Sequence, residues 1–137
     1  MTYNKPTPAL DPDSTKFWES CRAHQLQVQQ CSNCNRKRFP AKTHCANCQS
    51  TDHDWVEASN IGHVYSWIVV RHPIPKSVFG DDIPYAVALI DLEPGVRMVS
   101  RIVDCDPDDV AANMQVQVKF DDVTDELTLP NFKPIDR

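Results

Sequence analysis

Residues 31–48 read CSNCNRKRFPAKTHCANC and contain two Cys-x-x-Cys pairs. Cys31 pairs with Cys34 and Cys45 with Cys48, and ten residues separate the two pairs. Zinc takes four ligands in a tetrahedron, and a Cys-x-x-Cys turn presents two thiolates to one ion. Two such knuckles on neighbouring hairpins leave no open coordination position. We therefore predict a structural Zn²⁺ site with these four cysteines as ligands, inside a small β ribbon.

The residue after the second cysteine of a knuckle commonly adopts φ > 0, which favours glycine. Asn35 and Gln49 occupy these positions, so we expect weaker or strained binding rather than its loss. The alternatives to zinc are a degenerate site or a redox-active pair. His44 could replace a ligand, although an exposed hairpin residue is the favoured interpretation.

A short helix is expected before the ribbon, over residues 13–24, because Asp13 or Ser14 can cap its first turn. Phe17 and Trp18 give this helix an apolar stripe. So short a helix is marginal alone, and its stripe must therefore pack against another part of the molecule.

The pattern changes to that of strands after residue 60. Alternating and β-branched segments, bounded by Pro and Gly, predict five strands. We expect the last strand to stop at Pro130, and a long Pro-rich loop over 72–83 to carry the apolar Phe79. The predicted strands are 62–71, 84–92, 96–103, 116–120 and 126–129. Five strands in about 70 residues suit a small closed barrel.

Charge separates the chain into two halves. Residues 1–57 hold seven basic and six acidic side chains, whereas residues 58–137 hold seven basic and thirteen acidic ones. Four of the six cysteines lie between Cys31 and Cys48, within the first half. We predict a Pro-rich tail over 1–12, a helix plus zinc ribbon over 13–57 and a barrel over 58–137. The fold class is mainly β.

Hydropathy gives an expectation for the compartment. No apolar run approaches the ~18 residues needed to span a membrane, so we expect no membrane insertion. Residues 1–10 contain no apolar core of a signal peptide. A cytoplasmic location is expected, where cysteines stay reduced, and this favours metal over disulfides.

Further motifs follow the knuckles in a fixed order. They are Arg36, Phe39-Pro40, Trp55, Gly62-x-Val64-Tyr65-Ser66, Pro84-Tyr85-Ala86-Val87-Ala88-Leu89 and Leu129-Pro130-x-Phe132-x-Pro134. Over residues 15–134 the sequence resembles the acyl-CoA-associated OB-fold family with an N-terminal rubredoxin-like zinc ribbon. Asn113 departs from this family, which commonly has Gly before the residue matching Met114.

The resemblance implies a helical N-terminal segment, a zinc ribbon and a five-stranded OB-fold barrel. It also implies a small accessory subunit of enzymes that act on CoA thioesters. Those partners are thiolase-superfamily proteins, including sterol side-chain thiolases and aldolases, or hotdog-fold enoyl-CoA hydratases. The partner usually carries the catalytic residues, and the accessory chain acts as a scaffold or helps to shape an acyl-CoA channel.

The residues themselves offer little catalytic machinery, and we name no catalytic residue. Carboxylate pairs such as Asp81-Asp82 are read as solvated turns, because adjacent strand residues point to opposite faces. His63 and His72 have no orienting partner in the sequence. We therefore expect no catalytic activity from this chain alone, which agrees with an accessory role.

A basic patch follows the first knuckle at Arg36, Lys37 and Arg38. It could contact the phosphates of CoA, or it could be a solvated hairpin. A third possibility is nucleic acid, which ribbons and OB-folds also bind, but the barrel's formal charge of −6 would repel a polyanion.

Phe17, Trp18 and Phe79 are our candidates for docking to a partner protein, because unpaired apolar side chains mark interaction surfaces. The alternative for Phe79 is that it folds back and caps the barrel. The sequence thus predicts a zinc-stabilised accessory subunit of a thiolase-like enzyme acting on acyl-CoA, in lipid or sterol side-chain degradation.

Overall fold

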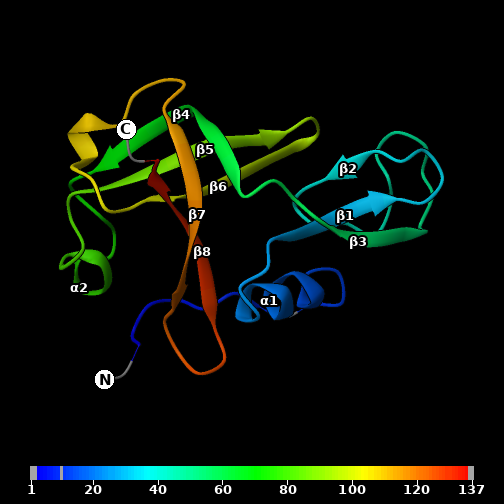
Figure 1. The fold of residues 1–137 in the computed structure, drawn as a ribbon. Coiled ribbons are helices and arrows are strands. Elements are labelled where there is room, and N and C mark those ends of the chain that lie inside the picture. Colours follow the sequence, from blue (N-terminus) through cyan, green and yellow to red (C-terminus); the bar gives the residue numbers. More distant parts are fainter. Residues whose placement is uncertain (1–2, 10, 136–137) are drawn as a thin grey trace.

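The N-terminal part combines one helix with a three-stranded sheet. The computed structural model describes residues 3–9 and 11–135. Helix α1 spans Thr15–Arg22, and the sheet has the order β2-β1-β3 with antiparallel pairing. Its strands are β1 (Gln27–Cys31), β2 (Lys37–Arg38) and β3 (His53–Glu57). Figure 1 shows this ribbon on the right, with α1 below the space between ribbon and barrel.

The cap of α1 differs from the expectation. Ser14 is the N-cap residue, but its side chain makes no capping hydrogen bond. Instead the Asp11 carboxylate accepts from the backbone N–H groups of Asp13 and Ser14, at 2.9 and 2.8 Å. The helix also ends earlier than predicted, at Arg22, because Ala23 is its C-cap and His24 adopts a left-handed φ of 58°.

The second part is a closed barrel with the strand order β4-β5-β6-β8-β7. Neighbouring strands are antiparallel except β6 and β8, which are parallel. The strands are β4 (Ile61–Val70), β5 (Tyr85–Glu93), β6 (Val96–Ile102), β7 (Gln115–Asp122) and β8 (Thr128–Pro134). Helix α2 (Lys76–Phe79) and the 3₁₀ turn η1 (Pro107–Asp109) lie in the connections. The predicted mainly β fold with an OB-type barrel is confirmed.

Strand β8 does not stop at Pro130 as expected. It continues to Pro134, and Pro130 lies opposite Phe120 of β7. On its other side β8 meets β6 only through the pair Ile102–Phe132, so the missing N–H of proline breaks no continuous ladder there. The Pro130 carbonyl still accepts a hydrogen bond from Ser100 Oγ at 2.5 Å.

The entry to β7 uses an asparagine where the family commonly has glycine. Asn113 adopts φ = 65°, a conformation that Asn tolerates better than most residues. Its N–H donates to the Val64 carbonyl at 2.8 Å, which ties this loop to β4. The departure from the family pattern therefore leaves the barrel intact.

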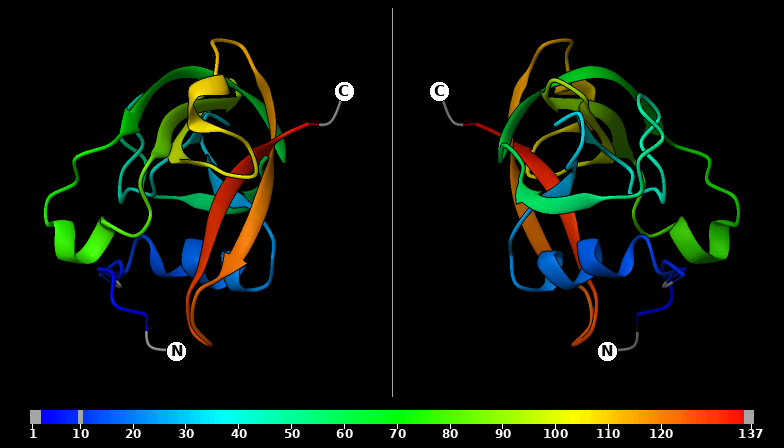
Figure 2. Two further views of the ribbon diagram at one scale, coloured as in Figure 1. Left: turned by 90° about the vertical axis from the view of Figure 1, so that its left-hand side faces the viewer. Right: turned by 90° about the vertical axis from the view of Figure 1, so that its right-hand side faces the viewer.

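One hydrophobic core joins the two parts. Phe17 and Cys21 of α1 and Val28 of β1 belong to the same buried cluster as Ile90 and Phe132 of the barrel. Helix α1 packs on β8 and β1. The N-terminal arm (residues 3–9) runs between α1 and α2 in both views of Figure 2. No helix in the described residues is long and apolar enough to cross a membrane.

Candidate functional site

The two cysteine knuckles repeat one backbone geometry. The Asn35 N–H donates to the Cys31 carbonyl, and the Gln49 N–H donates to the Cys45 carbonyl, both at 2.9 Å. Asn35 and Gln49 have φ values of 64° and 68°, the left-handed conformation that the spacing predicts. Each turn thereby aims two sulfur atoms toward the space between the knuckles.

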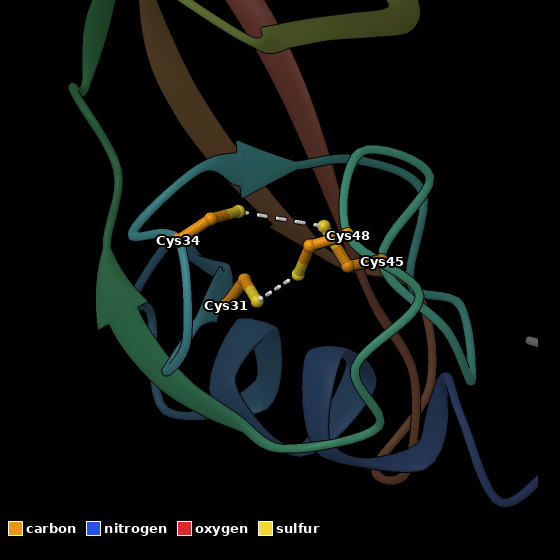
Figure 3. Close-up of side chains that lie close together, drawn as sticks. All are labelled: Cys31, Cys34, Cys45 and Cys48. Carbon is orange, nitrogen blue, oxygen red and sulfur yellow. Dashed lines mark hydrogen bonds between the residues drawn. The ribbon is translucent and has the colours of Figure 1, made fainter.

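The four sulfur atoms form one cluster, seen in Figure 3. All four lie within 4.8 Å of one another. The shortest separations cross between knuckles: Cys31 Sγ to Cys48 Sγ is 3.5 Å and Cys34 Sγ to Cys45 Sγ is 3.6 Å. Tetrahedral zinc with bonds of about 2.3 Å would hold sulfurs about 3.8 Å apart. The donor set and its spacing therefore fit a structural zinc ion, and four protein ligands leave no position for a substrate.

Two asparagines, one in each knuckle, support the thiolates of the opposite knuckle. The backbone N–H of Arg36 and the side chain of Asn47 lower the pKa of Cys34. The side chain of Asn33 is the largest cause of the lowered pKa of Cys48. Sequence reasoning missed both asparagines, although their matched position in the two Cys-x-Asn-Cys motifs was a visible signal.

Arg38 of the basic patch turns toward the interior of the ribbon. Its Nε donates to the Gln29 side-chain oxygen at 2.7 Å, and the same oxygen accepts from the Lys42 N–H at 2.9 Å. Gln29 is buried, so Arg38 stabilises the ribbon from within. Its Nη2 donates to the Lys42 carbonyl at 3.1 Å, so two of the guanidinium nitrogens are engaged within the ribbon.

Lys37 connects the ribbon to the barrel. Its Nζ donates to Glu93 Oε1 at 2.5 Å, and Glu93 Oε2 accepts from the Ser59 N–H at 2.7 Å. Lys37 is the largest cause of the lowered pKa of Glu93. At Gly95, an added Cβ would lie 2.6 Å from the Lys37 carbonyl oxygen, so the hairpin can approach this closely only without a side chain. We call this contact region the ribbon–barrel joint.

A groove of about 590 Å³ lies at this joint. Arg36 and Lys37 line it on the ribbon side, and Pro94 and Gly95 line it on the barrel side. Arg36 is exposed and forms no ion pair with any described residue. Within the basic patch, Arg36 is thus the side chain left free to meet an anion.

The three predicted docking residues meet around one cavity of about 640 Å³. Phe17 is buried, and Trp18 and Phe79 are half-buried. The Phe17 ring lies 5.1 Å from those of Trp18 and Phe39, at 79° and 53°. They therefore do not form a protruding patch. The large apolar side chains exposed to solvent are instead Ile61, Tyr65, Ile68, Ile74 and Val99.

Cys21, Cys105, His63 and His72 lie outside the cysteine cluster, and His44 is an exposed neighbour of Cys45 that is not part of it. Burial raises the pKa of Cys21 to about 12. Burial, followed by the nearby aspartates, also raises the pKa of Cys105. His63 Nε2 lies 3.8 Å from Asp91 Oδ2 across the β4–β5 pair, a partner that the sequence did not reveal. His72 is exposed.

Two family models match the chain in succession. The model described as the ChsH2 rubredoxin-like zinc ribbon domain matches residues 18–54, and that of the ChsH2 C-terminal OB-fold domain matches residues 55–121. Together they cover residues 18–121, which hold most of α1, the ribbon and the barrel up to β7.

Relatives with assigned names are of two kinds. A DUF35 domain-containing scaffold protein of Methanothermobacter thermautotrophicus is 33% identical over 116 residues, covering 83% of this chain and 86% of that protein. A probable enoyl-CoA hydratase alpha subunit of Thermomonospora curvata is 38% identical over 130 residues, covering 95% of this chain. The chain spans only 40% of the length of that hydratase subunit.

A solved structure is similar over nearly its whole length. It is titled "Ltp2-ChsH2(DUF35) aldolase", and the matching chain is 38% identical with a TM-score of 0.85. The match covers 93% of this chain and 98% of that chain. Sequence and fold therefore agree on the same set of relatives.

Proposed function

The chain belongs to the DUF35 family, with a ChsH2-type zinc ribbon and OB-fold, and we propose that it is a zinc-stabilised, non-catalytic accessory subunit of a thiolase-superfamily enzyme. The enzyme would act on acyl-CoA thioesters in the cytoplasm, in lipid or sterol side-chain degradation. The accessory chain would hold the partner and help to shape the acyl-CoA site.

The observation that carries this proposal is the likeness to the aldolase structure. Its title pairs Ltp2 with ChsH2(DUF35), and this chain covers 98% of the matching component. The relative in Methanothermobacter thermautotrophicus is named a scaffold protein, which supports a role in assembly. Both names describe a component of a larger assembly.

The chemistry of the side chains supports a role without catalysis. A nucleophilic cysteine needs a lowered pKa and access to substrate. The two cysteines outside the ribbon have raised pKa values, and the four inside it suit a closed metal site. The catalytic residues would then belong to the partner.

For zinc, we propose the role of a structural ion held by Cys31, Cys34, Cys45 and Cys48. When bound, it supplies four bonds that join two turns. Strands of five, two and five residues bury too little apolar surface to offset the entropy of ordering the ribbon, and metal ligation supplies the difference.

For acyl-CoA, we propose that the phosphates meet Arg36 at the joint groove, with Lys37 nearby. Arg36 is exposed and Lys37 lines the same groove, whereas Arg38 is engaged with Gln29. The contribution of Arg38 would then be to hold the hairpin in place.

A second candidate partner is an enoyl-CoA hydratase. The relative in Thermomonospora curvata carries this name, although this chain spans less than half of it. Binding to nucleic acid is less well supported, because Lys37 and Arg38 are engaged within the chain and the barrel is acidic.

Co-expression with a thiolase-superfamily protein of the same organism tests the proposal. We expect the two chains to co-purify, and cleavage of a carbon–carbon bond in the acyl chain of an acyl-CoA to require both. Full activity of this chain alone would contradict the proposal, as would a partner that is fully active without it. Water addition to an enoyl-CoA by a complex with a hotdog-fold protein would favour the second candidate.

A further inference from the structure

A cavity lies where the N-terminal arm, α1, α2 and the barrel meet. Its volume is about 640 Å³, within the range of about 300–1,000 Å³ that holds small organic ligands. Most of the lining side chains are apolar, and several are aromatic. They include Phe17, Trp18, Phe39, Phe79, Met98 and Leu129.

One end of this cavity is cationic. Arg101 Nη1 donates to Asp82 Oδ2 at 3.1 Å, and Lys5 Nζ lies 3.3 Å from the same oxygen. Two positive groups therefore share one carboxylate, which leaves a net positive charge. All three side chains are at most about one-third exposed, with 31%, 23% and 23% of their surfaces accessible for Arg101, Lys5 and Asp82. Partial burial strengthens their interaction with an added anion.

Arg101 is held in place before any ligand arrives. Its guanidinium lies 3.9 Å from the centre of the Tyr85 ring, a cation–π contact across β5 and β6. The only hydrogen bond that the Arg101 guanidinium makes to a described residue is the one from Nη1 to Asp82. Its Nε and Nη2 donors remain available, in the planar arrangement that suits a carboxylate.

A second carboxylate, without a paired cation among the described residues, lies elsewhere on the cavity wall. Asp121 belongs to β7, and β8 separates β7 from the β6 strand of Arg101. Two strand spacings put their backbones about 10 Å apart. An anionic head is thus attracted to the Arg101 end and repelled by the Asp121 end, and this gives a bound molecule one orientation.

We propose that this cavity binds an amphipathic organic anion, with its carboxylate on Arg101 and Lys5 and its apolar body against the aromatic wall. The site lies on this chain alone and is independent of any partner. Its failure in a binding experiment would therefore leave the proposed accessory role unaffected, and failure to assemble with a partner would leave this site unaffected.

Isothermal titration of the full purified chain with decanoate tests the site. We expect one saturable site per chain with a Kd below about 1 mM. The neutral 1-decanol should bind roughly tenfold more weakly, because it lacks the charge-assisted hydrogen bonds. In amide NMR spectra, decanoate should shift resonances of α1, α2, β6 and β8 and leave the two cysteine knuckles unchanged.

Two arginines of β6 provide a matched pair of variants. Arg97 also stacks on a tyrosine, at 3.8 Å from Tyr65, and also pairs with an aspartate, Asp91, but it lies outside the cavity. We expect Arg101→Gln to weaken decanoate binding at least tenfold, and Arg97→Gln to change it less than twofold. Phe79→Ala should weaken binding through loss of apolar contact.

Three results would overturn the proposal. They are the absence of saturable decanoate binding, equal affinity for decanoate and 1-decanol, and equal effects of Arg97→Gln and Arg101→Gln. Equal affinities for decanoate and 1-decanol would show that the cavity binds apolar chains without recognising the carboxylate.

Discussion

Gln49 and Asn35 occupy the same left-handed backbone position in the two knuckles. For most residues with a Cβ this conformation costs roughly 1–2 kcal/mol, and asparagine tolerates it better. Glycine adopts this conformation without the steric cost. It also raises the conformational entropy of the unfolded chain, and this offsets part of the gain in stability. The second knuckle therefore holds more strain than the first.

We predict that Gln49→Gly raises the free energy of unfolding by about 0.5–1 kcal/mol in the presence of zinc. Asn35→Gly, the matched control, should change it by less than about 0.5 kcal/mol. Urea unfolding at equal zinc concentration measures both. A gain of equal size for the two variants would mean that strain at Gln49 is not the cause.

Part of the cysteine site could be predicted, residue by residue, from the sequence. The four cysteines and the left-handed positions follow from spacing, which is local information. Asn33 and Asn47 were missed because each serves a cysteine of the other knuckle. The Lys37–Glu93 pair was also missed, since 56 residues separate its members.

At the level of elements, Glu93 is the main polar link between ribbon and barrel. It accepts from Lys37 of β2 and from the Ser59 backbone N–H, which precedes β4. Its pKa is lowered by these contacts. A carboxyl group with a lowered pKa stabilises the fold above its ordinary pKa of about 4.5, and this stabilisation is lost as the pH falls through the lower folded value.

We predict that Glu93→Gln lowers the free energy of unfolding at pH 7 by roughly 1–2 kcal/mol, because a charge-assisted pair becomes neutral. The difference from the parent chain should stay nearly constant from pH 7 to pH 5. Urea unfolding across this range measures it, and a difference that already shrinks by pH 5 would contradict the lowered pKa.

Asp91→Asn is the matched control for this variant. Asp91 lies on the same strand and pairs with Arg97, so both partners belong to the barrel. In hydrogen exchange, Glu93→Gln should loosen β2, whereas Asp91→Asn should leave β2 protected. Equal loosening would mean that Glu93 has no specific role in joining the two parts.

Most elements followed from sequence periodicity, and the exceptions have physical reasons. Strand β5 alternates buried and half-buried residues throughout, which is why its pattern was clear. The end of β8 was predicted too early, because proline usually stops a strand and the sparse β6–β8 pairing is not visible in a sequence. The turn α2 was missed because its four residues lie among prolines.

On the scale of the whole molecule, the ribbon and the barrel differ in what stabilises them. The barrel closes its own ladder of hydrogen bonds, whereas the ribbon has short strands around the cysteine cluster. The cavity beside α1 could not be predicted, since it needs the arm, two helices and three strands from distant parts of the sequence.

We predict that removing zinc with a chelator exposes residues 27–57 to rapid hydrogen exchange, while β4–β8 keep most of their protection. The reason is that the ribbon depends on four metal–sulfur bonds for its stability, whereas the barrel depends on its own apolar core and strand pairing. Exchange measured by mass spectrometry, with elemental analysis for zinc, tests this. Unchanged protection in the metal-free chain would contradict a structural role for zinc.

Two cysteine variants distinguish the effect of losing a zinc ligand from the effect of losing a thiol outside the cluster. Cys34→Ser should lower zinc content and the midpoint of thermal unfolding, whereas Cys105→Ser, outside the cluster, should leave the zinc content unchanged. If Cys34→Ser kept a full complement of zinc, the proposed ligand set would be wrong.

The closed order of the barrel also limits how this chain can aggregate. A sheet closed on itself offers no edge strand to another chain. Within the described residues, the main sheet with free edges is the ribbon, where β3 is five residues long and β2 only two. Intermolecular backbone pairing is therefore directed to β3, the longer of the two edge strands of the ribbon.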